Sequence, residues 1–350
     1  MSELVAVNGL EIKMAEKTLK ICIVGAGDMG LRHLNGWQAV ENAHIVAIVD
    51  DVPPRLRDAG RQFGVSGLYS NYQTAILETE PDVVSVCIPT AFHADVSLYA
   101  LEHGAHVLCE KPIALSLTDA DAMVETARRN SLLLTVGFML RYSQAIQDLK
   151  NWVAGGRIGR PILYVAENFM EVRPKILMHA RHVNGGPLID YWCHHFDLWS
   201  YLFESQPVSI AGYGAILAQG KPEVENLDAL AIDTAGVIVR YASGDIGQLA
   251  TSWGLPTALS GQALSSDKLI GPQGLITGNI RRDLVLHQAN GRSQEINNRG
   301  FDWWRDEIAA FAQTIRSGGK PLVTGENGRE ALRVSLAAIE AIETGQTINV

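Results

Sequence analysis

The sequence predicts an α/β protein, with an N-terminal doubly wound parallel sheet followed by an α+β domain that has a large open, mainly antiparallel sheet. Three observations predict this fold class. Short apolar, β-branched runs alternate with helix-like segments in the first part of the chain. A glycine-rich turn follows the first run. Beyond about residue 140, Gly and Asp turns separate strand-like runs, as in antiparallel sheets.

The strands of the first sheet are predicted by runs that are apolar nearly throughout, as strands buried on both faces of a parallel sheet are. The runs are LKICIVG (19–25), HIVAIVD (44–50), DVVSVCIP (82–89), AHVLCE (105–110) and LLLTVGF (132–138). Helix-like segments such as LTDADAMVETARRN lie between them. We therefore expect a doubly wound α/β domain over residues 18–140.

The second domain is expected over residues 141–350. Segments such as RPILYVAENFMEV and AIDTAGVIVRYASGDIGQLATSW have strand character. Helices are expected near residues 187–203, 302–317 and 327–344. Residues 1–17 form an N-terminal extension whose Asn8-Gly9 turn signal allows an extra hairpin, although a disordered or loosely packed segment is favoured.

Composition limits the classes of function. The 350 residues are 47% hydrophobic and 19% charged, as in soluble globular proteins, and the net charge of −9 argues against affinity for nucleic acid or anionic membranes. No apolar run is long enough to cross a bilayer, and the N-terminus is a poor signal peptide. The four cysteines lack CxxC spacing, so we expect buried free thiols in a cytoplasmic protein.

The first predicted strand runs directly into GAGDMG, residues 25–30. In this loop Gly25 allows a tight turn, Gly27 lets the backbone approach a pyrophosphate, and Gly30 permits close packing of strand and helix. Asp28 and Met29 open the following helix, whose N-terminal N–H groups favour phosphate. The loop therefore predicts a bound dinucleotide.

Asp50 ends the next predicted strand, about 20 residues after the last glycine of the loop. A carboxylate at this position accepts hydrogen bonds from the ribose hydroxyls of the cofactor and would repel a 2′-phosphate. The sequence thus favours NAD over NADP.

The AHVLCE strand continues into Glu110-Lys111-Pro112. A lysine at the carboxyl end of a parallel strand points into the crevice where doubly wound sheets bind ligands. Its ammonium could orient a substrate hydroxyl and share in proton transfer. Taken alone, a Lys-Pro after a strand is more often a surface turn.

Four polar residues lie in GGPLIDYWCHHFDLW, residues 185–199. On a continuous helix Asp190 and His194 share a face, Asp197 is three residues beyond His194, and His195 points elsewhere, toward the sheet or a subunit interface. No metal site is expected, because that face offers no second histidine. Two interpretations remain open on these residues alone: a core helix with polar contacts, or an acid–base pair in which His194 accepts a proton beside Asp190.

Taken together, the motifs GAGDMG (25–30), CIPTAFHAD (87–95), EKP (110–112), GFMLRY (137–142) and GGPLIDYWCHHFD (185–197) give the chain a resemblance to the Gfo/Idh/MocA oxidoreductase family, from about residue 18 onward. The resemblance implies a Rossmann domain that binds NAD(P) and hydride transfer to or from a carbon bearing a sugar or cyclitol hydroxyl. It also implies a homodimer or homotetramer assembled through the open sheet.

The resemblance also implies roles for individual residues. Lys111, Asp190 and His194 would be catalytic and would contact the substrate. Cofactor contacts beyond the glycine loop and Asp50 would come from Pro89, Thr90, His93, Glu110 and Lys111. Apart from the resemblance, further polar residues could line the substrate pocket: Arg141, Tyr142, Arg173, His179, Arg181 and His182. Trp253 could stack on a sugar face, although core packing is favoured for it. The sequence departs from the family at Trp192, where relatives often carry a small residue, and at His195.

The expected activity is NAD-dependent oxidation of a secondary alcohol, or the reverse, on a sugar, sugar derivative or cyclitol. One alternative is an NAD-dependent glycosidase that acts through transient oxidation of its substrate. The other is a non-catalytic sensor that binds NAD and a sugar, although such a sensor would have no need for Lys111, Asp190 and His194 together.

Overall fold

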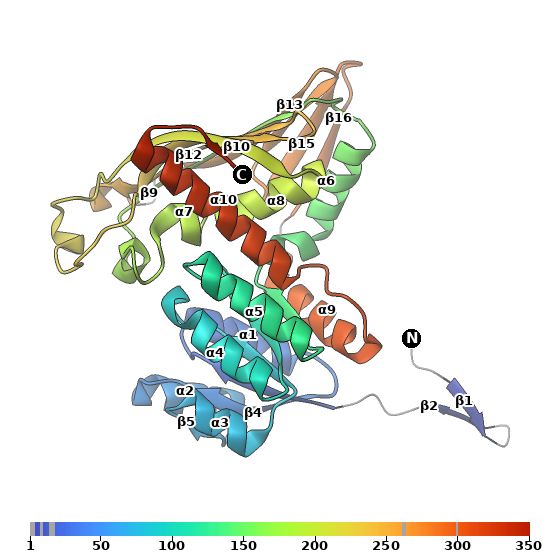
Figure 1. Cartoon of the computed structure of the whole chain (residues 1–350). Coiled ribbons are helices and arrows are strands. Elements are labelled where there is room, and N and C mark those ends of the chain that lie inside the picture. The colour runs from blue at the N-terminus through green and yellow to red at the C-terminus, as the bar shows by residue number, and fades with distance from the viewer. Residues whose placement is uncertain (1–3, 8–9, 14–17, 261–263, 299) are drawn as a thin grey trace.

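The computed structural model describes residues 4–7, 10–13, 18–260, 264–298 and 300–350. A parallel sheet with its helices forms one end of the molecule, and a large open sheet forms the other (Figure 1), which confirms the predicted fold class. All four cysteines are buried and free, as expected. None of the helices in the described ranges is both long and apolar enough for a membrane span.

The first sheet has the strand order β5-β4-β3-β6-β7-β8, and every neighbouring pair is parallel. Its strands are β3 (Leu19–Val24), β4 (Ala43–Val49), β5 (Leu68–Tyr69), β6 (Val83–Val86), β7 (His106–Cys109) and β8 (Leu134–Val136). Five of these are the predicted runs. The sixth, β5, was not predicted, because two residues carry no periodicity.

Helices cover both faces of this sheet because alternate strand residues point to opposite sides. Leu19, Ile21 and Ile23 of β3 belong to one core cluster, together with apolar residues of α1 and α2, whereas Cys22 and Val24 belong to another cluster with residues of α3, α4 and α5. The helices are α1 (Asp28–Gln38), α2 (Pro53–Phe63), α3 (Tyr72–Thr79), α4 (His93–Glu102) and α5 (Leu117–Arg129).

The second sheet, in the part of the chain that the structure describes, has the order β16-β15-β14-β13-β9-β12-β11-β10-β17. Only β9 and β12 run parallel; the other neighbouring pairs are antiparallel. The strands are β9 (Leu163–Glu171), β10 (Pro207–Ala215), β11 (Thr234–Tyr241), β12 (Ile246–Leu255), β13 (Leu264–Gly271), β14 (Gly274–Gly278), β15 (Asp283–Gln288), β16 (Ser293–Asn297) and β17 (Ile348–Asn349).

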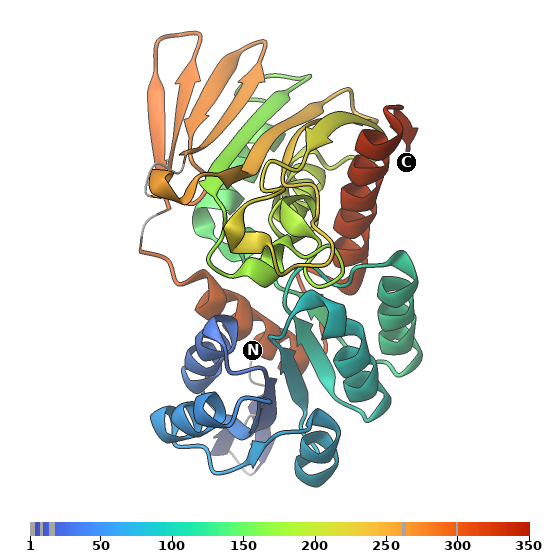
Figure 2. The same ribbon diagram turned by 90° about the vertical axis from the view of Figure 1, so that its left-hand side faces the viewer.

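One face of this sheet packs against helices, and the other is open (Figure 2). The packed face meets α6 (Gln144–Ala154), α7 (Gly186–Asp190), α8 (Cys193–Phe203) and α10 (Gly325–Thr344). Buried and exposed residues alternate along β11, and the exposed set includes Ile238, which is 45% exposed. Tyr213 of β10 lies opposite Gly236 on the same outer face and is 79% exposed.

The last two helices connect both parts of the molecule. Helix α9 (Trp303–Ser317) packs against α1, and its residues Ile308, Phe311 and Ala312 join the core cluster of the first sheet. Helix α10 contacts α5 and β8 of the first part as well as α8 and β10 of the second. The C-terminal segment therefore fixes how the two parts face each other.

At the N-terminus, β1 (Leu4–Val7) pairs antiparallel with β2 (Leu10–Lys13). The structure thus has the hairpin that the turn signal allowed, and Figure 1 shows it projecting from the body of the molecule. The turn residues Asn8 and Gly9 lie outside the described residues.

Candidate active site

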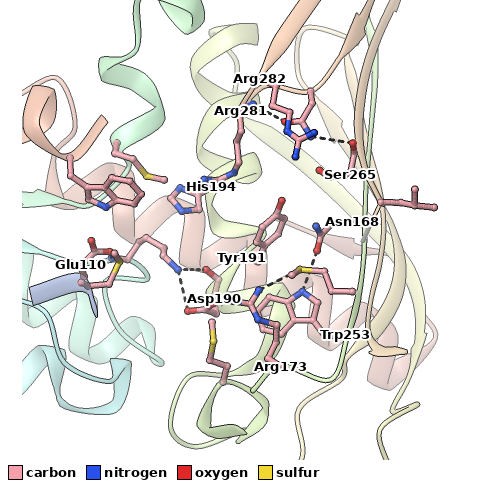
Figure 3. Close-up of a pocket in the computed structure, with 18 residues that line it drawn as sticks. Glu110, Asn168, Arg173, Asp190, Tyr191, His194, Trp253, Ser265, Arg281 and Arg282 are labelled. Atoms are coloured by element: carbon pink, nitrogen blue, oxygen red, sulfur yellow. Dashed lines mark hydrogen bonds and ion pairs between the residues drawn. The ribbon is translucent and has the colours of Figure 1, made fainter. Parts of the chain in front are cut away.

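A cavity of about 670 Å³ lies where the carboxyl ends of the parallel strands face the second sheet. Both parts of the molecule contribute to its wall (Figure 3). The lining residues are Met29, Glu110, Lys111, Met139, Asn168, Met170, Arg173, Met178, Asp190, Tyr191, His194, Trp253, Leu264, Ser265, Asn279, Arg281, Arg282 and Trp304. The cavity thus brings together Lys111, Asp190 and His194, the three residues expected to be catalytic.

Lys111 reaches this cavity from the end of β7 and meets Asp190 from α7. Its Nζ donates to the backbone oxygen of Asp190 at 2.7 Å and to the carboxylate Oδ1 at 3.2 Å. Burial disfavours the charged lysine, but the carboxylate of Asp190 outweighs it and raises the pKa of Lys111. Since an ammonium has three donors, one N–H remains for a ligand.

Glu110 supports Lys111 from behind. Its Oε2 accepts the backbone N–H of Lys111 at 3.1 Å, and its Oε1 lies 3.2 Å from Nε2 of the buried His33 on α1. Burial alone would raise the pKa of Glu110, but the hydrogen bond with His33 outweighs it and the pKa is lowered. An ionised carboxylate therefore lies directly beneath the lysine.

The helix that carries Asp190 and His194 is interrupted, so the prediction of one helix over 187–203 is wrong. Helix α7 ends at Asp190, and α8 begins at Cys193. At the break the N–H of Trp192 bonds back five residues to Pro187, whereas the N–H of His194 bonds back only three, to Tyr191. Such a widened turn is a recognised irregularity of helices at functional sites. It changes the relative rotation of the two residues, yet both face the cavity.

His194 is a buried, uncharged base. Its side chain lines the cavity, and its Nδ1 is buried without a hydrogen-bond partner among the described residues. Burial lowers the pKa of His194 well below its usual value, and the positive charges of Arg281 and Lys111 lower it further. A neutral imidazole beside an ammonium can accept a proton from a bound hydroxyl.

The neighbouring histidine faces away from the cavity, which confirms the expectation that it points to the sheet. Nε2 of His195 lies 3.3 Å from Oδ1 of Asp267 on β13, and the hydroxyl of Tyr164 donates to the same oxygen at 2.9 Å. Trp192 is fully buried and packs against the His195 ring at a centroid distance of 4.5 Å. His195 thus anchors the start of α8 to the sheet, and Trp192 packs behind it.

The glycine loop fits a dinucleotide. Gly25 has a φ of +99°, and a Cβ there would collide with the backbone of Cys87. A Cβ on Gly27 would meet nothing within 4 Å, so this position is open to a ligand. No side chain caps the N-terminus of α1, where Asp28 and Met29 lie. The pyrophosphate of NAD would be held at this N-terminus.

Asp50 lies at the end of β4, as predicted, and is engaged on all sides. It accepts hydrogen bonds from the backbone N–H groups of Ala26 and Val52, each at 2.8 Å. Arg55 binds it through two bonds of 2.8 and 2.7 Å, which the sequence did not suggest because two prolines intervene. Burial opposes ionisation, yet these donors lower the pKa of Asp50. The ribose of NAD would meet a carboxylate already paired with an arginine.

The other expected cofactor contacts line the turn beside the loop. Ring nitrogens Nδ1 and Nε2 of His93 each lie 2.8 Å from a backbone oxygen, that of Pro112 and that of Ile88 respectively. His93 thus ties the turn after Lys111 to the segment before Pro89. Pro89 is exposed, whereas Thr90 is buried and its N–H bonds to Asn184.

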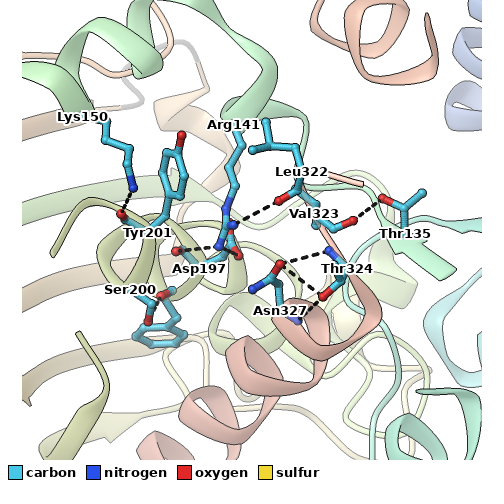
Figure 4. A network of polar contacts seen from close by, with 11 residues as sticks. Thr135, Arg141, Lys150, Asp197, Ser200, Tyr201, Leu322, Val323, Thr324 and Asn327 are labelled. Carbon is cyan, nitrogen blue, oxygen red and sulfur yellow. Dashed lines mark hydrogen bonds and ion pairs between the residues drawn. The ribbon is translucent and has the colours of Figure 1, made fainter. Parts of the chain in front are cut away.

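The structure places two expected substrate contacts away from the cavity. Arg141 is buried, and its guanidinium binds Oδ1 and Oδ2 of Asp197 at 2.6 and 2.8 Å. Figure 4 shows this pair between α8 and the segment that carries Leu322. His182 is exposed and does not line the cavity. Asp197, expected to have a structural role, has one as the partner of Arg141.

Several cavity residues had no strong signal in the sequence. Asn168, Tyr191 and Arg281 were not singled out, and Arg173 and Trp253 were noted only as residues that could line a pocket. Each comes from a different strand or turn of the second part. Only the charge of adjacent Arg281 and Arg282 in a Gly-Asn turn could have drawn attention to that segment.

Comparisons with known proteins also indicate an NAD-binding oxidoreductase. The model of the "Oxidoreductase family, NAD-binding Rossmann fold" matches residues 19–138, and the "GFO/IDH/MocA C-terminal domain" matches residues 146–265. A myo-inositol 2-dehydrogenase of Thermotoga maritima is 28% identical over 94% of this chain and 98% of its own. A scyllo-inositol 2-dehydrogenase (NAD(+)) of Bacillus subtilis is 28% identical over 95% and 96%. The crystal structure of a probable dehydrogenase from Thermotoga maritima superimposes with a TM-score of 0.77 at 26% identity, covering 95% of this chain and 98% of the other.

Proposed function

The chain belongs to the Gfo/Idh/MocA family of NAD-binding oxidoreductases, and on this premise we propose that it transfers a hydride between NAD and a secondary alcohol or ketone of a sugar, sugar derivative or cyclitol. One observation carries the proposal. Lys111 from the nucleotide-binding part and Asp190 and His194 from the other part line one cavity beside the glycine loop. The inositol dehydrogenases among its relatives support the substrate class.

The chain's own residues would manage the proton and the orientation of the alcohol. NAD, when bound, supplies the acceptor for the hydride. His194 takes the proton from the reacting hydroxyl. The remaining N–H of Lys111 donates to the same oxygen and stabilises the negative charge that develops there. Asp190 holds Lys111 and offers a carboxylate oxygen to a neighbouring hydroxyl.

The proposal is tested by a screen for NADH absorbance with NAD+ and a panel of inositols, aldoses, sugar acids and glycosides. Formation of NADH with a polyol supports it. Release of free sugar from a glycoside without net NADH would instead indicate the glycosidase alternative. Binding of NAD and a sugar with no turnover in either direction would indicate the sensor.

The pH dependence of alcohol oxidation should reflect the lowered pKa of His194. A histidine with its usual pKa would be half protonated near pH 6.5 and could not accept a proton below it. Because burial depresses this pKa, we expect kcat/KM to stay level as the pH falls from about 8 to about 6.5, and to decline only at lower pH. An acid limb centred near pH 6.5 in the pH profile of kcat/KM would contradict a buried neutral His194.

We also propose that two or four copies associate through the open face of the second sheet. Tyr213 and Ile238 on this face are 79% and 45% exposed, and exposed apolar side chains that gather on one face mark sites of protein–protein contact. Ile238→Asp should shift the mass measured by light scattering toward the monomer, with an unchanged circular dichroism spectrum. An unchanged mass would place the interface elsewhere.

A further inference from the structure

The wall of the cavity formed by the second sheet and its neighbouring loops is rich in arginine. Arg173, Arg281 and Arg282 line it, and Lys111 faces it from the other part. The acidic residues in the lining are Glu110 and Asp190, which are already paired with His33 and Lys111. Four cationic side chains thus face two carboxylates, a surplus of positive charge in a protein whose net charge is −9.

Arg281 is held rigidly in this wall. It lies in the turn between β14 and β15, where Asn279 Oδ1 accepts its backbone N–H at 2.8 Å. The next N–H back along the chain, that of Ile280, donates to the buried Asp267 at 2.9 Å. The turn is therefore tied to the same carboxylate that anchors His195.

Among the described residues, the guanidinium of Arg281 has no acidic partner. It lies 5.8 Å from the ring centroids of both Tyr191 and Trp303, which restrict its orientation. Its Nε is buried, and no hydrogen-bond acceptor for it is found among the described residues. A buried donor without an acceptor costs free energy, and the side chain would remove that cost by turning this nitrogen toward an anion in the cavity.

Arg281 lies at the end of the cavity where His194 is found. Figure 3 shows its side chain extending toward His194, and after burial its charge is the largest cause of the lowered pKa of that histidine. The glycine loop belongs to the opposite wall, where Asp28 is paired with Lys175 at 2.5 Å. This location favours the substrate over the pyrophosphate of NAD as the partner of Arg281.

We propose that the substrate is an anionic polyhydroxy compound, a sugar or cyclitol that carries a carboxylate or a phosphate. Its anionic group binds the guanidinium of Arg281, and Arg173 and Arg282 add positive charge. Lys111 and His194 contact the hydroxyl that reacts. This inference rests on the dehydrogenase function proposed above and narrows its substrate class. Guanidinium groups match both anions because their parallel N–H groups can bind two oxygens at once.

Matched pairs of ligands test the proposal. The anionic members are D-glucuronate, D-galacturonate and myo-inositol 1-phosphate, and their neutral counterparts are D-glucose, D-galactose and myo-inositol. Binding of each to the enzyme–NADH complex is measured by calorimetry, and kcat/KM is measured with NAD+. At least one anion should bind about 10- to 100-fold more tightly than its counterpart, the range expected for a charge-assisted contact. The member that does so distinguishes carboxylate from phosphate.

Variants locate the effect. Arg281→Met should reduce the advantage of the anion to less than about threefold, and Arg281→Lys should restore part of it because the charge returns without the fork. Arg292→Met, which removes an exposed arginine from the turn between β15 and β16, is the matched control and should change neither ligand's affinity. The Kd of NADH should be the same in all variants.

The results separate this inference from the function on which it rests. Anion binding that depends on Arg281, without NADH formation from any ligand, would contradict the dehydrogenase function and leave the anion site standing. Oxidation of neutral polyols in preference to every anion would overturn the anion site and leave the dehydrogenase. Weaker NADH binding by Arg281→Met would also overturn it, because it would assign the arginine to the cofactor.

Discussion

Replacing His194 with alanine is expected to lower kcat for alcohol oxidation by about two to four orders of magnitude, the usual contribution of a general base. Lys111→Ala should cost a comparable factor, because it removes the donor that stabilises the developing negative charge. Steady-state kinetics with the best substrate of the NADH screen measure both effects.

The binding of NADH provides the necessary contrast. Its Kd, measured by fluorescence titration, should change little in His194→Ala, since that residue lies on the wall opposite the glycine loop. His44→Ala removes an exposed histidine at the start of β4 and should leave kcat unchanged. Turnover near that of the wild type in both His194→Ala and Lys111→Ala would refute the roles proposed for these residues.

The second large effect concerns stability. Arg141→Met should lower the free energy of unfolding by about 3–5 kcal/mol, because it leaves the buried carboxylate of Asp197 without its partner. The double variant Arg141→Met/Asp197→Leu should recover most of this loss, since removing both charges also removes the cost of their burial. Urea denaturation followed by circular dichroism measures both changes.

A surface ion pair serves as the reference. Arg61 and Asp58 are paired at 2.6 Å, but their side chains are 78% and 70% exposed. Arg61→Met should therefore change the free energy of unfolding by less than about 1 kcal/mol. If Arg141→Met unfolds at the same urea concentration as Arg61→Met, the buried pair does not have the structural role described here.

Local patterns were sufficient for the nucleotide-binding part. The five long apolar runs became strands, and the positions of Gly25, Gly27 and Asp50 follow directly from where those strands end. These features can be recognised from patterns within short segments of the sequence. Strand β5 and the reach of Arg55 across two prolines to Asp50 depend on packing, so the sequence did not reveal them.

In the second part of the molecule, the positions of the site residues were harder to predict from the sequence. The break at Tyr191 and Trp192 has no glycine or proline to indicate it, so a continuous helix was expected. Arg281 reaches His194 only because β14 and β15 belong to the same sheet as β9 and β12. Arg141 follows a strand of the first sheet and was expected at the substrate, but the carboxylate of Asp197 binds it elsewhere.

The position of α9 has a consequence for how the chain is made. Ile308, Phe311 and Ala312 complete the core around Trp37 and β3, nearly 300 residues after that strand. During synthesis the chain leaves the ribosome N-terminus first, and domains generally fold as they emerge. The core of the nucleotide-binding part therefore remains uncovered on one side until α9, which follows the second sheet, has been synthesised. We propose that residues 18–140 expressed alone would expose this apolar surface and aggregate, whereas addition of a peptide spanning α9 would keep them soluble.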